Sequence, residues 1–177
     1  MITVWNSLVR PCLDYCSPVW SPRPSNLQEI DLVEQTQRSF TRQIEGMEGL
    51  DYSQRLKKLR MYSIQRRNER FKIIYMYKIK ENLVPNISNK YGLTFRINGR
   101  RGCIADIPSF RPGSRARKAR DNSFAWTACN LWNSLPKYVR NIAGKDVYFK
   151  NKVDKVLAFY PDIPRCSRSG HSYDRKK

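Results

Sequence analysis

The carboxylates are the first side chains to test for chemistry, because two-metal polymerases and nucleases need several of them to converge on one site. The nine aspartates of this chain are isolated from one another, and the sequence contains no paired-aspartate turn. We expect Asp14 to be a satisfied polar group on a helix, and Glu45 and Glu48 to face solvent. The carboxylate pattern therefore predicts neither a metal site nor an acid–base pair.

The cysteines and the single histidine give little indication of a catalytic or metal-binding site. His171 lies in a polar C-terminal stretch, whereas Ser/His/Asp or Cys/His catalysis needs a histidine held by a rigid surrounding shell. Cys12 and Cys16 are one helical turn apart, but the sequence has no C-x2-C pair, no zinc-knuckle spacing and no glycine-rich phosphate-binding motif. We predict free thiols in a reducing compartment, no cofactor, and no enzyme activity in this chain alone.

Positive charge is the strongest functional signal. The formal net charge is +19 over 177 residues, with a sequence pI of about 10.1. It is uneven, since residues 1–50 carry a net −2 and residues 51–177 a net +21. Such asymmetry favours a polyanionic partner, most often nucleic acid. A membrane partner is not expected, because no apolar run approaches the roughly 20 residues that span a bilayer and no long helix pairs a basic face with a strongly apolar one.

Two stretches concentrate this charge. Residues 55–72 and residues 96–120 each hold eight Lys or Arg and one acidic residue, with aromatic residues between them. Such clusters can neutralise phosphates and stack bases. One alternative is that the charged residues are simply solvated beside an ordinary core helix. A second alternative is a non-catalytic module that docks an acidic protein. The predicted nucleic-acid contacts are Arg66, Arg67, Arg70, Arg100, Arg101, Arg111, Arg115, Arg117, Lys118, Arg120 and Trp126.

Residues 111–139 combine a basic run with a predicted helix. Pro112 and Gly113 loosen the basic run, Ser123 can cap a helix, and Pro136 ends it. Trp126 lies off the apolar row of that helix, just after the basic run. The row itself has helical spacing and is expected to be core; it consists of Phe124, Ala128, Leu131 and Trp132.

Upstream, the pattern is helical. We expect helical structure over residues 1–20, in which Pro11 either kinks the helix or marks a junction between two helices. A further helix should begin near Asn26 through a capping box of Ser25 and Gln28. Asp51 should open a short helix, and Ser63 should cap a long one that reaches about residue 82. The second helix is expected to turn Ile30, Val33, Gln37, Phe40 and Ile44 inward.

Downstream, residues 93–97 alternate, Asn98-Gly99 favours a turn and residues 103–105 can return, which predicts a weak hairpin. Asp146 should open a last helix with Phe149, Val153, Val156 and Leu157 inward. The expected fold is mainly α, a helical bundle with a small extended or β-hairpin insertion and a disordered basic C-terminal tail. Its expected parts are a helical region 1–90, an extended basic segment 91–121, C-terminal helices 122–160 and the tail 161–177.

Several stretches together resemble the region just downstream of the polymerase core in non-LTR retrotransposon reverse transcriptases of the jockey and chicken-repeat type. Their order and spacing agree across roughly residues 4–160. The matching pieces are LVRPCLDYCSPVWSP (8–22), DLVEQTQRSFTR (31–42), YSQRLKKL (52–59), Arg66-Arg67 with YKI (77–79), Ser123-Phe124, LWNSLP (131–136) and FKNKVD (149–154).

The resemblance implies a parent RNA-directed DNA polymerase that uses Mg²⁺, in which residues 1–90 are thumb-like and the upstream polymerase region is a partner. The family's catalytic aspartate pair has no counterpart here, so no catalytic residue is carried over. The matched Trp20, Tyr52, Leu56 and Trp132 are expected to be packing positions. The expected partners are RNA, DNA or both, in the nucleus or cytoplasm rather than in a secreted protein, and the sequence does not indicate an oligomeric state.

Overall fold

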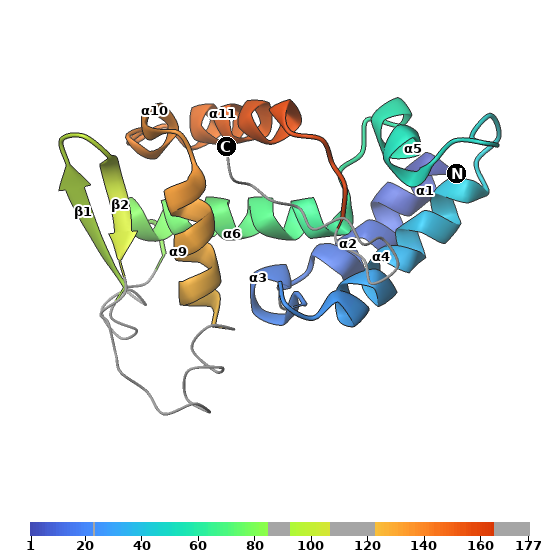
Figure 1. Cartoon of the computed structure of the whole chain (residues 1–177), viewed down its shortest axis with the longest axis horizontal. Helices are drawn as coiled ribbons and strands as arrows, with labels where there is room; N and C mark the ends of the chain where they lie inside the picture. The colour runs from blue at the N-terminus through green and yellow to red at the C-terminus, as the bar shows by residue number, and fades with distance from the viewer. Residues whose placement is uncertain (23, 85–92, 107–122, 165–177) are drawn as a thin grey trace. The chain divides into compact units, whose positions relative to one another are not determined.

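A computed structural model describes residues 1–22, 24–84, 93–106 and 123–164, and it is mainly α-helical with one β-hairpin, as predicted (Figure 1). The elements are α1 (Ile2–Val4), the π-helical turn η1 (Trp5–Val9), α2 (Arg10–Asp14), α3 (Ser17–Trp20), α4 (Leu27–Arg42), α5 (Tyr52–Lys58), α6 (Ile64–Lys80), β1 (Thr94–Asn98), β2 (Gly102–Asp106), α9 (Phe124–Ser134), α10 (Lys137–Arg140) and α11 (Asp146–Phe159).

The chain divides into two compact units, and the division differs from the predicted boundaries. Unit 1 comprises Met1–Asn68 with the described residues that follow Phe159, and unit 2 is Glu69–Phe159. The boundary falls inside α6, because the second half of this helix packs in the apolar core of unit 2. Residues 161–164 depart from the predicted disordered tail, since Asp162 bonds to Ser63 directly before α6. Residues 165–177 lie outside the described part.

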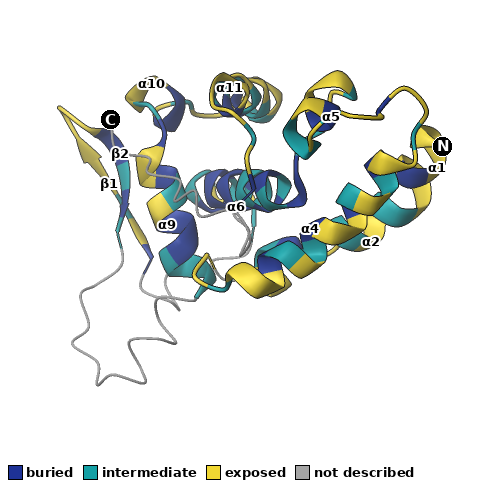
Figure 2. Ribbon diagram, turned by 45° about the vertical axis from the view of Figure 1, so that its right-hand side comes forward, coloured by how far each residue is buried: buried dark blue, intermediate teal, exposed yellow. Residues whose placement is uncertain are grey.

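Unit 2 has an apolar core to which all its elements contribute. Apolar side chains of α6, β2, α9, α10 and α11 form one buried cluster, and α11 runs alongside α6 (Figures 1 and 2). Trp132 is fully buried at its centre, with Phe95 and Phe149 against its ring at centroid distances of 5.9 Å. Phe149 also stacks on Tyr77 at 4.0 Å. The predicted inward row of α9 and that of α11 are therefore confirmed as core or core-packing positions.

The predicted hairpin of unit 2 is confirmed. β1 and β2 pair antiparallel, with Phe95 opposite Ala105 and Asn98 opposite Gly102. Gly102 has a φ of +74°, and a Cβ at this position would lie 2.5 Å from the Asn141 side-chain oxygen. Only glycine meets both demands, the left-handed backbone and the close approach of α10.

Unit 1 is built around α4. Trp5 of η1 stacks on Phe40 of α4, with centroids 4.2 Å apart, and Ile30, Met47 and Leu56 are buried. α4 begins as expected, but its cap is Asn26, whose side chain accepts from the Glu29 N–H, rather than the predicted Ser25. The predicted caps of the next helices hold, since Asp51 and Gln54 form a capping box and the Ser63 hydroxyl accepts from the Arg66 N–H.

The first twenty residues differ most from the sequence-based expectation. Helical structure is broken after Asp14, where Cys16 takes a left-handed conformation with a φ of 50°. The predicted junction at Pro11 is present, because Pro11 stands in the first turn of α2, directly after the π-helical turn η1. A first helical turn tolerates the N–H that proline lacks. Of the apolar residues of this segment, Trp5 is buried, whereas Leu8 and Val19 are 66% and 85% exposed.

Candidate nucleic-acid interface

The structure places the three predicted arginines of α6 in ion pairs with the protein itself. Arg66 is only 7% exposed and donates to the backbone oxygens of Tyr160 at 2.8 Å and Pro161 at 2.7 Å. Arg67 makes a two-pronged pair with Asp14, whose predicted role as a satisfied polar group is thereby confirmed.

Arg70 makes the same kind of pair within unit 2. Its guanidinium donates to both carboxylate oxygens of Asp154 on α11, with one nitrogen–oxygen distance of 2.8 Å. The prediction that Arg66, Arg67 and Arg70 contact nucleic acid therefore gains no support from these contacts and stays a prediction. A phosphate would have to displace bidentate carboxylates or buried carbonyls that already satisfy these donors.

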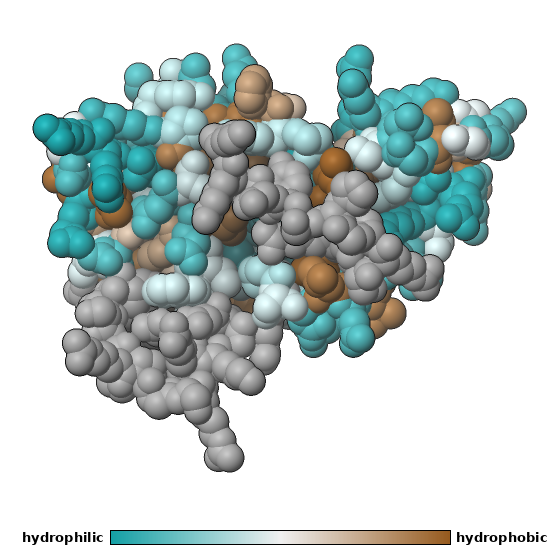
Figure 3. Space-filling view, in the orientation of Figure 1, coloured by the Kyte–Doolittle hydropathy of each residue, from teal (hydrophilic) through white to brown (hydrophobic). Residues whose placement is uncertain are grey.

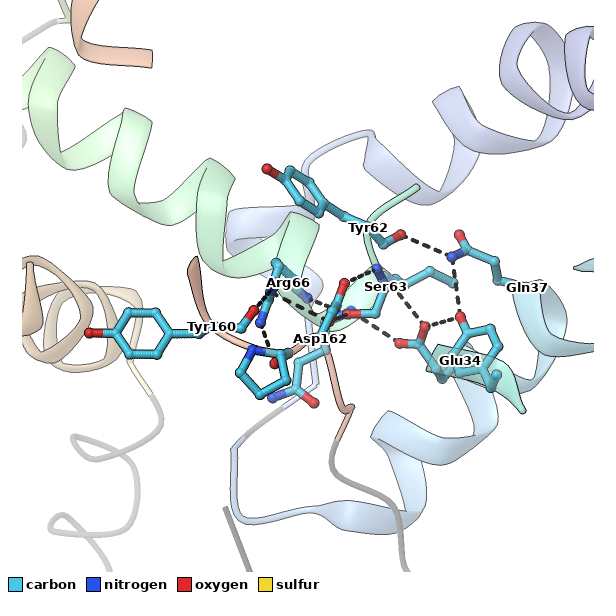
Figure 4. A network of polar contacts seen from close by, with 11 residues as sticks. Glu34, Gln37, Tyr62, Ser63, Arg66, Tyr160 and Asp162 are labelled. Carbon is cyan, nitrogen blue, oxygen red and sulfur yellow. Dashed lines mark hydrogen bonds and ion pairs between the residues drawn. The ribbon is translucent and has the colours of Figure 1, made fainter. Parts of the chain in front are cut away.

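The start of α6 shows where Arg66 is used (Figure 4). The first N–H groups of a helix have no partner within the helix. Here the Glu34 carboxylate accepts from the N–H of Ile64 at 3.0 Å and of Gln65 at 3.1 Å. The Asp162 carboxylate accepts from the Ser63 N–H at 2.8 Å and from its hydroxyl at 2.7 Å. Arg66 lies 3.4 Å from Asp162 and partly neutralises this acidic cap.

Glu34 is a buried acid that the sequence-based prediction missed. It is 1% exposed and also accepts a hydrogen bond from the Tyr52 hydroxyl. Burial raises the pKa of the Glu34 carboxyl above its usual range, although the bonds from Tyr52 and from the α6 backbone oppose this, and the nearby Asp162 charge adds to it. A signal was present, because Ile30, Glu34, Gln37 and Thr41 repeat at helical spacing, and all four are buried.

The loop of the β-hairpin in unit 2 presents two predicted contacts, Arg100 and Arg101, and both are exposed. The Asn98 side-chain oxygen accepts from the backbone N–H groups of Arg100 at 3.0 Å and Arg101 at 3.2 Å, which fixes the turn. Lys137 of α10 reaches the same loop, where its ammonium donates to the Gly99 oxygen at 2.7 Å. The loop therefore gathers three cations.

The hairpin that carries this loop is clamped along the edge of β2 that faces away from β1. The Asn141 side chain accepts from the Cys103 N–H at 2.9 Å, and the Asn133 side chain both accepts from and donates to the Ala105 backbone, at 3.0 and 2.8 Å. The Cys103 oxygen accepts from Trp132 Nε1 at 3.2 Å and from Arg140 at 3.1 Å. These hydrogen bonds hold β2 in place, so the loop that carries Arg100 and Arg101 has a fixed base.

The remaining predicted contacts are only partly visible. Trp126 is half-buried on α9, and its N–H donates to the Ser123 hydroxyl that caps this helix. Arg111, Arg115, Arg117, Lys118 and Arg120 lie outside the described residues, and their role remains a prediction. The wider charge favours unit 2, since residues 69–159 hold 19 Lys and Arg against six Asp and Glu, a net formal charge of +13.

Metal and thiol chemistry finds no support in the described part of the chain. Within it, no group of three or more His, Cys, Asp or Glu side chains could hold a metal ion. Cys12 and Cys16 are exposed, while Cys103 and Cys129 are buried. Burial raises the pKa of the Cys129 thiol to about 12, so it stays protonated at neutral pH. Among the described helices, none has both the length and the apolarity to cross a bilayer.

Comparison with known proteins gives no match to a family model, to a curated protein or to a solved structure. The case for a function therefore rests on the charge distribution of the sequence and on the geometry of the hairpin loop.

Proposed function

We propose that this chain binds the phosphate backbone of RNA or of an RNA–DNA hybrid, and that it is the region downstream of the polymerase core in a retrotransposon reverse transcriptase. The observation that carries the binding proposal is the hairpin loop of unit 2, where Arg100, Arg101 and Lys137 are exposed around one rigid turn. The proposed role is to hold a template or hybrid, while the catalytic Mg²⁺ site belongs to the parent polypeptide.

Phosphate is the ligand that suits this loop. An arginine guanidinium presents paired donors that match the oxygens of a phosphate, and it stays charged at any physiological pH. Arg96 on β1 also lies in the hairpin, but it is paired with Asp106, so its charge is partly neutralised. The fixed turn lowers the entropy cost of presenting Arg100 and Arg101 together. Surface hydropathy agrees, since hydrophilic residues predominate on the hairpin side of the view in Figure 3.

The test is binding of a labelled single-stranded RNA and a matched RNA–DNA hybrid to the full chain, measured by fluorescence anisotropy from about 50 to about 200 mM salt. Each neutralised phosphate should contribute a slope of about −0.7 for a single strand. The double variant Arg100→Ala/Arg101→Ala should therefore flatten the single-strand slope by about 1.4 units.

A matched control removes the same charge elsewhere. Arg42 and Lys57 are exposed cations of unit 1, and the double variant Arg42→Ala/Lys57→Ala should leave the slope nearly unchanged. Equal losses in the two double variants would show diffuse attraction rather than a site. A flat wild-type salt titration, or competition by heparin but not by RNA of equal charge, would instead favour an acidic protein partner.

The proposed parentage has separate tests. Genomic DNA immediately upstream of the Met1 codon should encode, in frame, a strand-turn-strand with paired aspartates. The purified chain should not extend a primed template in the presence of Mg²⁺, and extension by this chain would overturn the assignment of the chemistry to another part of the polypeptide.

A further inference from the structure

β1 is the outer strand of the hairpin in unit 2, and its far edge is open. β2 lies between β1 and the helices α9 and α10 (Figure 1), and Figure 2 shows β1 mostly exposed and β2 mostly buried. An open edge can pair with another chain, so many proteins protect it with proline, a bulge or charged side chains. β1 contains neither proline nor a bulge, and its one charged residue, Arg96, is paired with Asp106.

The hydrogen bonds of β2 show which backbone groups of β1 face this edge. The N–H groups of Cys103 and Ala105 donate to asparagine side chains at α10 and α9, so they point away from β1. The residues opposite them on β1 are Ile97 and Phe95. Opposed residues of an antiparallel pair turn their backbone groups either toward each other or away from each other. The N–H and C=O groups of Phe95 and Ile97 therefore point outward at the open edge.

These outward groups form a preformed docking edge. Within the described residues, no hydrogen bond is made to the backbone N–H or C=O of Phe95 or of Ile97. The strand that carries them is fixed, because β2 is held by α9 and α10 and the Phe95 ring packs on Trp132. A second strand that pairs here therefore does not have to order β1, which reduces the entropy cost of binding.

The alternation of donors and acceptors determines which kind of ligand suits the edge. The phosphates of a nucleic acid offer acceptors alone, so they leave the outward C=O groups of Phe95 and Ile97 without donors. An extended polypeptide offers both a donor and an acceptor at every second residue, with the spacing that strand pairing requires. The backbone chemistry of this edge therefore favours a polypeptide.

The side chains around the edge add a preference for charge. Arg96 is 71% exposed at its side chain even though it is paired with Asp106, and Arg100 and Arg101 are exposed in the adjoining loop. Ile97 is 91% exposed and lies on the opposite face of β1 from Arg96, since successive side chains of a strand alternate. A complementary strand carries an apolar side chain beside Ile97 and an acidic one beside Arg96.

We propose that β1 binds an extended acidic segment of a protein partner by strand addition, which enlarges the hairpin to a sheet of three strands. The inference goes beyond the proposed nucleic-acid binding and does not depend on it, because it uses the edge of β1 rather than the loop cations. Backbone hydrogen bonds to Phe95 and Ile97 provide the affinity, and the alternation of apolar and acidic side chains provides the selectivity.

A second copy of this chain suits the edge less well. A two-fold pairing in which Phe95 of each copy bonds to Ile97 of the other places the two Arg96 side chains opposite each other, and like charges in that position are destabilising. The net charge of +13 on residues 69–159 also opposes the approach of two such units.

The experiment measures binding of a fluorescein-labelled peptide to the full chain by fluorescence anisotropy. The peptide alternates valine with glutamate over about eight residues, a usual length for a strand. In one matched peptide the valine nitrogens are methylated, which keeps the charge and removes the donors that face β1. In another, lysine replaces glutamate. Both should bind at least about tenfold more weakly than the parent peptide.

Two protein variants test the same edge. Ile97→Pro removes an outward donor that has no partner in the hairpin, and proline is tolerated at such an edge position. It should weaken binding of the valine–glutamate peptide about tenfold and leave the salt slope of RNA binding unchanged. Ile97→Val keeps the N–H and the branched side chain, so its affinity for the peptide should stay within about twofold of the wild type.

Hydrogen exchange reads the edge directly. In the free chain the outward amides of Phe95 and Ile97 should exchange faster than the amide of Arg96, which faces β2. The valine–glutamate peptide should protect Phe95 and Ile97. Slow exchange of both amides in the free chain would show that the edge is already covered, and it would overturn the proposal.

The remaining outcomes separate strand addition from its rivals. Equal binding of the parent and valine-methylated peptides shows attraction by charge alone and overturns strand addition, even if Ile97→Pro fails to fold. Protection of Phe95 and Ile97 by single-stranded RNA but not by the peptide assigns the edge to nucleic acid, and a dimer in sedimentation that Ile97→Pro dissociates assigns it to a second copy. Each overturns the proposal. Failure of the wild type to bind RNA concerns the proposed function alone.

Discussion

The interiors of the two units differ in kind, since that of unit 1 is rich in polar side chains and that of unit 2 is mainly apolar. Unit 1 buries several polar side chains, including Glu34, Gln37 and Thr41 along α4, together with Arg55 and Arg66. Unit 2 buries an apolar cluster of four helices and a hairpin, and among its described residues the buried polar side chains are Lys72, Thr127 and Arg140.

Apolar and polar interiors stabilise a fold in different ways. An apolar core stabilises the fold in proportion to the apolar area that it removes from water, and it tolerates apolar substitutions of similar volume. A polar network stabilises only while each of its members is satisfied, but it fixes which groups must meet. In unit 1 the network joins Glu34 to Ile64 and Ser63 to Asp162, and the two partners of each pair are far apart in the chain. Unit 2 instead has an apolar interior, and its exposed cations include Arg100, Arg101 and Lys137.

The largest predicted effect is in the unit 2 core. Trp132→Ala removes a fully buried ring, its contacts with Phe95 and Phe149, and the bond to the Cys103 oxygen. It should lower the free energy of unfolding by about 3–5 kcal/mol in a urea titration. Tyr138→Ala, at a position that is 60% exposed on α10, should change it by less than about 0.5 kcal/mol. Similar losses in both variants would contradict the core assignment.

The next effect tests the polar network of unit 1. Glu34→Ala leaves the N–H groups of Ile64 and Gln65 and the Tyr52 hydroxyl without their buried acceptor, which should cost about 2–4 kcal/mol. Hydrogen exchange should show lost protection at Ile64 and Gln65. Protection at Trp132 in unit 2 is the control. If it falls to the same extent, the two interiors form one cooperative block and the comparison fails.

A smaller effect is expected at the C-terminal side of the same cap. Asp162→Asn keeps one acceptor oxygen for Ser63 but removes the charge that faces Arg66, so we expect a loss of about 1–2 kcal/mol. The sensitive measurement is limited proteolysis after residue 160, which should become faster. Asp51→Asn, at the exposed capping box of α5, is the matched control, because asparagine caps helices as well as aspartate. Equal proteolysis rates in both variants would argue against the cap.

The smallest effect is the pH dependence that Glu34 confers. Its folded-state pKa is raised above the unfolded value by burial, so the folded state holds the proton more tightly. The contribution is therefore fully present below the unfolded pKa of about 4.5 and is lost as the pH rises through the raised folded pKa. The stability difference between wild type and Glu34→Gln should shrink as the pH rises above the unfolded pKa of about 4.5. A difference that grows with pH would mean that the hydrogen bonds outweigh burial.

Much of the fold could be read from local signals. The caps at Asp51 and Ser63, the Asn98-Gly99 turn and the end of α9 before Pro136 depend on neighbours in the sequence, and each is where the sequence placed it. The candidate site was predicted less well. Charge identified Arg66, Arg67 and Arg70 together with Arg100 and Arg101, but only the last two are exposed on a loop.

The reason is that charge density along the chain does not say which cations have partners. Arg67 meets Asp14 and Arg70 meets Asp154 across 53 and 84 residues, and no local pattern relates such positions. The bonds of Asn133 and Asn141 to the backbone of β2 were also not predicted from the sequence. No local sequence pattern marks an asparagine that bonds to a distant strand.

Composition and the spacing of residues within single elements were sufficient to predict the helical class, the apolar rows of α9 and α11, and the excess of positive charge after residue 50. Three features became visible only in the folded chain: the division of α6 between two units, the capping of α6 by Glu34 and Asp162, and the exposure of Arg100 and Arg101. These depend on where distant segments meet, and pairing between distant carboxylates and guanidiniums is set by the packed fold rather than by local propensity.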